Sequence, residues 1–228
     1  MEYVINILKN NTFKKFMLFS FLLIGYLTFE VIYLIIGIDF TNITKELYIL
    51  LSLIKYIFFM LLLILIYRKY LKEKWKDFRI NFKKYAKISV KDWFTGFIIM
   101  IIANVIISNY ITGLGENEAA VQTIIAKLPL MAFFMTTLFA PFNEEMIFRK
   151  SLQDVIKNKY LYMILSGFIF GLVHVIGSNN PYEYLLIISY GALGFMFAHT
   201  INKTDNIFCT IMMHMFHNGV LTILAMVI

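Results

Sequence analysis

The sequence predicts an all-α fold, a polytopic bundle of about seven transmembrane helices within one membrane domain covering residues 1–228. Apolar residues make up 60% of the chain, only 15% of the residues are charged, and the mean hydropathy is +0.75. A soluble domain is about half apolar and about a quarter charged. Apolar stretches recur along the whole chain, and several reach the roughly 20 residues that a helix needs to cross a membrane. These observations indicate an integral membrane protein.

Seven apolar stretches are long enough to be counted as expected spans. They cover residues 16–38, 47–67, 93–111, 128–156, 160–177, 184–200 and 207–228. The first is too long for the apolar core of a signal peptide and has no small-residue cleavage site, so we expect it to remain in the protein. The fourth is long enough to bend or to extend beyond the membrane.

The basic residues predict the orientation of these spans. Most of the 21 lysines and arginines fall before the first span or in alternate loops, including Lys9, Lys14 and Lys15 and the run from Arg68 to Lys91. Cytoplasmic loops are enriched in basic residues. The pattern therefore predicts a cytoplasmic N-terminus, an external C-terminus and an odd number of spans. It also accounts for the net charge of +7, so we expect no nucleic-acid partner.

The connector at residues 68–92 combines this positive charge with an apolar face. Leu71, Trp75, Phe78, Phe82 and Tyr85 are separated by steps of four and three residues, the spacing of one face of a helix. An amphipathic helix of this kind lies in the headgroup region and attracts anionic lipid. The alternatives are an ordinary positive-inside anchor or a surface that binds substrate.

Two charges lie inside the first pair of spans. Glu30 and Lys55 are equally far from the loop at 39–46, so an antiparallel hairpin would place them at similar depth. Charged groups in a membrane are costly and are usually paired or functional. We expect a structural ion pair, with a substrate or proton pathway as the alternative.

The fourth span contains a second group of charges. Glu144 and Glu145 are adjacent, so they project about 100° apart on a helix and can serve different partners. Glu145 and Arg149 have the favourable order for an intrahelical ion pair, which leaves Glu144 without its own counter-ion. Pro141 frees a backbone carbonyl one turn back and can kink the helix.

The fifth span ends in Phe170-Gly-Leu-Val-His174. Glu144 and His174 are equally far from the turn near residues 157–160, so we expect them at matching depth on neighbouring helices. Gly167 and Gly171 form a small-residue strip that allows another helix to approach closely.

The seventh span adds His214 and Asn218, which share a helix face. Each polar group in this half of the chain requires a partner inside lipid. Alone, each is more often a hydrogen-bonded structural residue, but together they favour one shared, hydrated cavity.

These residues resemble the three motifs of the CPBP family, which contains the type II CAAX prenyl endopeptidases and the Abi proteins of bacteriocin processing and self-immunity. The motifs are Glu144-Glu145-x-x-x-Arg149, Phe170-x-x-x-His174 and His214-x-x-x-Asn218. The resemblance covers residues 127–226, which would form the catalytic core. Residues 1–111, with the N-terminal spans and the basic connector, show only generic membrane features.

The resemblance implies an intramembrane, metal-independent endopeptidase. Glu144 would be the catalytic glutamate, His174 would help to position the attacking water, and His214 with Asn218 would stabilise the oxyanion. Glu145, Arg149 and Phe170 would support the site. The implied partner is a peptide or membrane-protein substrate.

Other readings of the same residues stay open. A zinc ion bound by Glu144, His174, His214 and His217 is an alternative, although no His-Glu-x-x-His helix is present. A proton-coupled transporter, or a bacteriocin self-immunity or scaffold protein of the same fold, are alternative functions. His199 is interpreted as structural.

The substrate and the oligomeric state cannot be read from the sequence. A chain this rich in Lys, Asn and Ile indicates an AT-rich prokaryotic genome, where prenylated proteins are not expected. We therefore expect the protein in a prokaryotic cell membrane, with processing of a peptide or membrane protein as plausible as cleavage of a prenylated tail.

Overall fold

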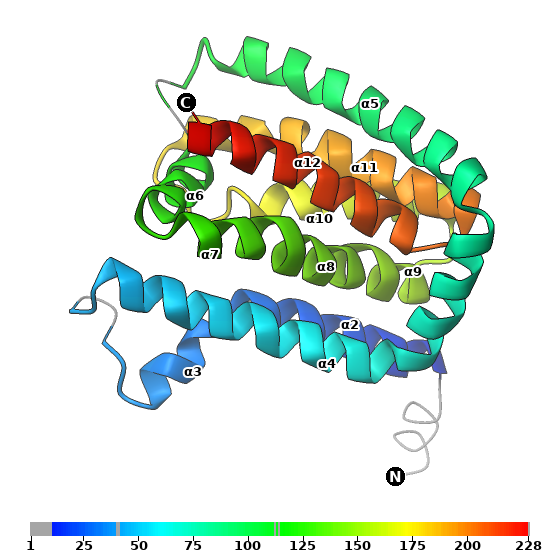
Figure 1. The fold of residues 1–228 in the computed structure, drawn as a ribbon, viewed down its shortest axis with the longest axis horizontal. Coiled ribbons are helices and arrows are strands. Elements are labelled where there is room, and N and C mark those ends of the chain that lie inside the picture. Colours follow the sequence, from blue (N-terminus) through cyan, green and yellow to red (C-terminus); the bar gives the residue numbers. More distant parts are fainter. Residues whose placement is uncertain (1–10, 40–41, 112, 114, 228) are drawn as a thin grey trace.

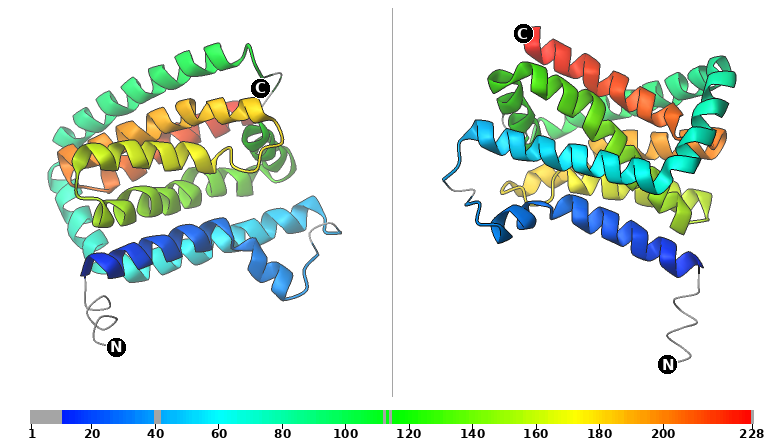
Figure 2. Two further views of the ribbon diagram at one scale, coloured as in Figure 1. Left: turned by 180° about the vertical axis from the view of Figure 1, so that it is seen from behind. Right: turned by 60° about the horizontal axis from the view of Figure 1, so that its bottom comes forward.

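A computed structural model describes residues 11–39, 42–111, 113 and 115–227, and all regular secondary structure in these ranges is helical. Lys9, which contributed to the predicted orientation, lies outside the described residues. The long helices run side by side as a bundle (Figure 1), with the N-terminal hairpin on one side and α5 on the other. The two further views show the same arrangement (Figure 2).

The helices follow in this order along the chain. They are α2 (Asn11–Leu27), α3 (Glu30–Ile35), α4 (Lys45–Ile80), α5 (Phe82–Ile107), α6 (Glu116–Lys127), α7 (Pro129–Phe134), the π-helix η1 (Met135–Phe139), α8 (Ala140–Glu145), the π-helix η2 (Met146–Ser151), α9 (Leu152–Val155), α10 (Lys159–Val173), the 3₁₀ helix η3 (Pro181–Leu185), α11 (Leu186–Thr204) and α12 (Phe208–Val227).

Four helical segments in the described part of the chain are long and apolar enough to cross a membrane, which agrees with an integral membrane protein. They are Lys45–Ile80, Phe82–Ile107, Pro181–Thr204 and Phe208–Val227. The apolar helix α10 has 15 residues, and the expected span at 128–156 consists of the consecutive segments α7 to α9. The expected count of seven spans is therefore not confirmed.

The expected first span at 16–38 is broken in two. Helix α2 ends at Leu27 and α3 begins at Glu30. The Thr28 hydroxyl donates to the Ile24 carbonyl at 2.8 Å, a side-chain bond of the kind that competes with regular helix geometry. The expected span therefore consists of two helices, because an apolar composition does not reveal such a local break.

The predicted pairing of Glu30 with Lys55 is confirmed. Lys55 Nζ lies 2.8 Å from Glu30 Oε1, and the ammonium group also lies over the ring of Tyr26, 5.1 Å from its centroid. Glu30 begins α3, which follows directly after α2, and it lies opposite Lys55 on α4, as the expected hairpin requires.

Residues 68–92 form the corner between α4 and α5 at one end of the bundle (Figure 1). Three of the five residues assigned to the apolar face are buried within the protein: Leu71, Phe78 and Tyr85. Trp75 packs against Phe208 at the start of α12, with the ring centroids 5.1 Å apart. This face therefore packs largely against protein, which the pattern alone could not distinguish from a face turned toward lipid.

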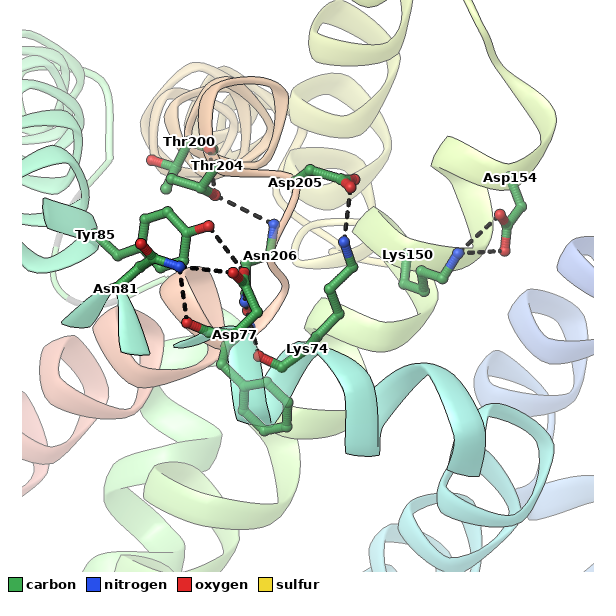
Figure 3. Close-up of polar contacts among 11 residues, drawn as sticks. Lys74, Asp77, Asn81, Tyr85, Lys150, Asp154, Thr200, Thr204, Asp205 and Asn206 are labelled. Carbon is green, nitrogen blue, oxygen red and sulfur yellow. Dashed lines mark hydrogen bonds and ion pairs between the residues drawn. The ribbon is translucent and has the colours of Figure 1, made fainter. Parts of the chain in front are cut away.

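Asp77 ties this corner to the link between α11 and α12. Its side chain accepts hydrogen bonds from Asn81 Nδ2 at 2.7 Å, Tyr85 Oη at 2.8 Å and Asn206 Nδ2 at 2.8 Å (Figure 3). The corner and the connections α9–α10 and α11–α12 lie at the same end of the molecule (Figure 1), which we call the basic end because most of the basic residues cluster in them.

Helix α10 packs closely on α11, as the glycine strip predicted. A Cβ atom added to Gly171 would lie 2.5 Å from the Ile187 carbonyl oxygen, and one added to Gly167 would lie 2.8 Å from that of Gly191. Only glycine permits this backbone contact. The contact holds α10, which carries Phe170 and is followed by His174, at a defined position against α11.

Helix α11 packs in turn against α5 through a buried carboxylate. Asp92 is 2% exposed and accepts hydrogen bonds from Thr200 at 3.0 Å and Lys203 at 3.4 Å. His199, interpreted as structural, lies beside it with Nδ1 3.1 Å from Asp92 Oδ2. Asp92 was not singled out from the sequence because it follows the basic connector and resembles an ordinary loop charge.

Candidate active site

The candidate site is built on a continuous helical stretch from Pro129 to Val155. Two π-helical segments, η1 and η2, flank α8, which carries Glu144 and Glu145. Segments of π-helix inside α-helices are rare and often occur at functional sites, since each changes the direction in which the following side chains project.

Pro141 and Asn218 explain the geometry at the first π segment. In η1 the hydrogen bonds run from residue i to i−5, as from the Ala140 amide to the Met135 carbonyl. Pro141 has no N–H, so the next carbonyl in this register, that of Thr136, is left without its helical partner. Asn218 Nδ2 on α12 donates to this carbonyl at 3.0 Å. The prediction that Pro141 frees a carbonyl is thus linked to the position of Asn218.

Glu145 and Arg149 form the expected ion pair at the centre of the bundle. Arg149 Nε lies 3.3 Å from Glu145 Oε2, and both side chains are fully buried. The guanidinium also packs on the face of Phe170, 4.1 Å from the ring centroid. None of its three nitrogens has a hydrogen-bond acceptor among the described residues, so its remaining charge is balanced by the aromatic ring and nearby carboxylates.

His214 lies between the two adjacent glutamates. Its Nδ1 is 2.9 Å from Glu145 Oε1, and its Nε2 is 3.7 Å from Glu144 Oε2. A carboxylate accepts hydrogen bonds, so Nδ1 donates to Glu145 and Nε2 faces Glu144. The sequence predicted different partners for the two glutamates, whereas the structure brings them to different nitrogens of one imidazole.

The two glutamates differ in exposure. The Glu145 side chain is fully buried and is held by Arg149 and His214. The Glu144 side chain is 13% exposed, and the basic side chain within 4 Å of it among the described residues is His214. Glu144 is therefore the carboxylate of this pair that a water molecule or substrate can reach.

His174 joins this cluster through Phe170. Its Nδ1 lies 2.7 Å from the Phe170 carbonyl oxygen, which can only accept, so Nδ1 carries the proton. In the neutral ring Nε2 is then left with a free lone pair. The Phe170 ring contacts His174, His214 and the Arg149 guanidinium, with centroid separations of 4.5 Å and 5.7 Å for the two histidines.

Helices α6 and α11 hold the other face of His174. The Tyr190 ring stacks on the imidazole, with centroids 4.5 Å apart and planes at 23°. Asn117 Nδ2 donates to the Tyr190 hydroxyl at 3.3 Å. Neither residue was predicted, since a tyrosine and an asparagine in these segments have no distinguishing spacing.

His217 lies away from this group. It accepts a hydrogen bond from Trp93 Nε1 at 3.3 Å and packs against Phe97 of α5. His217 was one of the four ligands considered for zinc. In the described ranges, no group of three or more His, Cys, Asp or Glu side chains is placed so that it could hold a metal ion. The predicted residues that do come together are Glu144, Glu145, Arg149, Phe170, His174 and His214, with Asn218 one turn beyond His214 on α12.

The buried Asn143 also supports the helical stretch Pro129–Val155, which we call the motif helix. Its Nδ2 donates to the carbonyl of Tyr56 on α4 at 2.9 Å, which ties α8 to the N-terminal hairpin. Its position directly before the two glutamates was the only available signal in the sequence, and the prediction did not use it.

Comparisons with known proteins support a membrane protease at the level of the family. Residues 126–220 match the family described as type II CAAX prenyl endopeptidase Rce1-like, a range that contains all three motifs. A protein of Bacillus subtilis (strain 168) named as the membrane peptidase YdiL is 29% identical over 184 residues, covering 77% of this chain and 71% of the relative. No solved structure matches.

Proposed function

Because this chain belongs to the CPBP family of membrane proteases, we propose that it is an intramembrane endopeptidase that cleaves a peptide or membrane protein with water activated by Glu144 and His174. The observation that carries this proposal is the unequal pair of glutamates around His214. One is buried and holds the imidazole, and the other is partly exposed and reaches the opposite nitrogen.

In the first step, water is activated between Glu144 and His174. The Glu144 carboxylate accepts a proton from the water as the water oxygen bonds to the scissile carbonyl carbon. The lone pair on His174 Nε2 orients the second water hydrogen, because Nδ1 is held by the Phe170 carbonyl. General base catalysis by a positioned carboxylate typically accelerates a reaction by about 10²–10⁴.

The negative charge that forms on the carbonyl oxygen is stabilised from α12. His214, held at Nδ1 by Glu145, presents Nε2 as one donor, and Asn218 donates its second amide hydrogen while the first is bound to the Thr136 carbonyl. Collapse of the tetrahedral intermediate breaks the C–N bond, and Glu144 returns its proton to the leaving nitrogen. We propose that Glu145 and Arg149 keep His214 oriented throughout, and that no metal takes part.

The test compares purified wild type with Glu144→Gln on a quenched fluorescent peptide library in lipid nanodiscs. Glu73→Gln, which removes one exposed carboxylate from α4, is the matched control. We expect Glu144→Gln to lower kcat by about 10²–10⁴ with unchanged thermal stability, and Glu73→Gln to behave as wild type. Equal cleavage by all three proteins would contradict the proposed site.

A second arm treats the wild type with a strong zinc chelator. We expect the same rate of cleavage before and after treatment. Loss of activity that returns on adding zinc would contradict the metal-independent mechanism while leaving the peptidase assignment intact.

A further inference from the structure

A cavity of about 440 Å³ opens at the basic end of the bundle, apart from the candidate active site. Its walls come from α4, from the end of the motif helix at η2 and α9, from the start of α10, and from the α11–α12 link. Three separate parts of the chain, residues 70–74, 150–162 and 202–205, therefore converge on this space.

The cavity has an excess of positive charge. The ionisable residues in its wall, tyrosines aside, are Lys74, Lys150, Lys157, Lys159, Asp154 and Asp205. Two of the lysines are paired with the two aspartates, as Figure 3 shows. Lys74 Nζ lies 2.7 Å from Asp205 Oδ2, and Lys150 Nζ lies 2.8 Å and 2.9 Å from the two oxygens of Asp154.

The other two lysines carry the net charge of the cavity. Within the described part of the chain, neither Lys157 nor Lys159 has an ion pair, and Lys157 Nζ donates only to the Gln153 carbonyl at 3.0 Å. Beside them, Tyr162 is 1% exposed and its hydroxyl has no hydrogen-bond partner among the described residues. Tyr162 is one of the residues that line the cavity, and because buried polar groups are normally satisfied, its unpartnered hydroxyl is a candidate partner for a polar ligand.

We propose that this cavity binds a phosphate group, supplied by the headgroup of an anionic phospholipid or by a free phosphate compound. Lysine ammonium groups are common phosphate ligands, and basic pockets between membrane helices bind anionic headgroups. The basic end lies where the predicted topology puts the cytoplasmic headgroups. The paired aspartates neutralise Lys74 and Lys150, which leaves a charge of two lysines to match one phosphate.

Binding at this site is separate from the proposed peptide cleavage and would occur in a catalytically silent protein. The two sites nevertheless share one helix, because Lys150 directly follows Arg149 and forms its ion pair with Asp154 one turn further on. The ligand would therefore contact the segment that ends the motif helix.

The experiment measures binding to the full-length protein in detergent by native mass spectrometry, with phosphatidylglycerol, phosphatidylcholine and inorganic phosphate as probes. The test variant is Lys157→Gln/Lys159→Gln. Its control, Lys83→Gln/Lys84→Gln, removes the same charge from exposed positions of the corner outside the cavity. We expect wild type to retain phosphatidylglycerol over phosphatidylcholine, and the test variant to bind it roughly fivefold more weakly for each lysine removed.

A second matched pair tests the hydroxyl group. Tyr162→Phe keeps the ring and removes the unpartnered oxygen, whereas Tyr160→Phe makes the same change at a residue that is 77% exposed. We expect Tyr162→Phe alone to weaken binding, by about tenfold, the effect typical of a lost hydrogen bond to a charged group.

The outcomes separate the sources of phosphate. Lipid retention that depends on the cavity residues supports a headgroup site, and cavity-dependent retention of inorganic phosphate with equal retention of the two lipids supports a soluble phosphate compound. Retention that falls equally in the test and control lysine variants, or no retention of any probe, would overturn the proposal.

Discussion

Two glutamate-based ion pairs lie within the apolar bundle, one in the N-terminal hairpin and one in the motif helix. Glu30 at the start of α3 and Lys55 on α4 are 2.8 Å apart, and their side chains are 34% and 15% exposed. Glu145 and Arg149 are four residues apart on one helical stretch, 3.3 Å apart and fully buried. The first pair is shorter and better solvated, and the second is more deeply buried and less completely hydrogen bonded.

The difference lies in what else each pair contacts. Lys55 has its carboxylate and one aromatic ring, so the charge in the hairpin is neutralised locally. Glu145 extends through His214 to the partly exposed Glu144, while Arg149 packs on Phe170, which also touches His174. An ion pair that contacts further titratable groups can support catalysis, whereas an isolated ion pair serves mainly to join helices.

The largest effect on folding is expected at Arg149. Replacing it with methionine leaves Glu145 as a buried carboxylate without its cation, and breaking a buried pair in this way typically costs about 3–5 kcal/mol. We expect Arg149→Met to lower the free energy of unfolding by this amount, measured by thermal or chemical denaturation in detergent.

The double variant Glu145→Gln/Arg149→Met provides the control for that result. Because it removes both charges, it should recover much of the lost stability, but not peptidase activity, since His214 Nδ1 loses its charged carboxylate partner. A single Arg149→Met variant as stable as the wild type would show that the buried pair does not bear on folding.

The next effect is expected at Asn218, which borders the same cluster. Asn218→Ala removes a donor proposed for the oxyanion, and loss of one such donor typically lowers kcat by about 10²–10³. Thr222→Val is the matched control. Thr222 contacts the same residue, Thr136, through a hydroxyl pair at 2.9 Å, but lies a further turn from His214.

Steady-state kinetics with one cleaved peptide would separate these two variants. We expect kcat to fall only for Asn218→Ala, with both variants folded. A similar fall for Thr222→Val would show that Asn218 acts by supporting the Thr136 turn rather than at the reacting carbonyl.

Much of the helix pairing could be predicted from the sequence because two simple patterns report it. Distance from a loop predicts depth in a hairpin, and it correctly paired Glu30 with Lys55. Residue spacing predicts a shared helix face, and it correctly identified the contact of Glu145 with Arg149 and the close glycine packing of α10.

Rotation about the helix axis could not be predicted in the same way. Position relative to the turn matched Glu144 with His174, but the histidine found within 4 Å of Glu144 in the described ranges is His214. The π-helical segments around α8 change the direction of the side chains that follow, and no composition signals them. The sequence also could not show which face of α12 packs on α5, and so it did not predict that His217 turns toward Trp93.

In the sequence, an apolar helix face that contacts lipid also looks the same as one that packs against protein. The apolar face at 68–92 packs partly on α12, and the expected first span is broken after Leu27. The first feature depends on a contact with a distant segment and the second on a local side-chain hydrogen bond, and hydropathy records neither.

The smallest effect is expected at the hairpin pair, and it tests the comparison most directly. Glu30→Gln leaves Lys55 without its carboxylate in a partly solvated position, for which a loss of about 1 kcal/mol is typical. The double variant Glu30→Gln/Lys55→Met should be destabilised less than Glu30→Gln alone, because no uncompensated charge remains. Thermal unfolding measures stability, and kcat on the same peptide should stay at the wild-type value in both proteins. A fall in kcat without a fall in stability would instead place Glu30 and Lys55 on a path that serves the site, and the two ion pairs would no longer differ in kind.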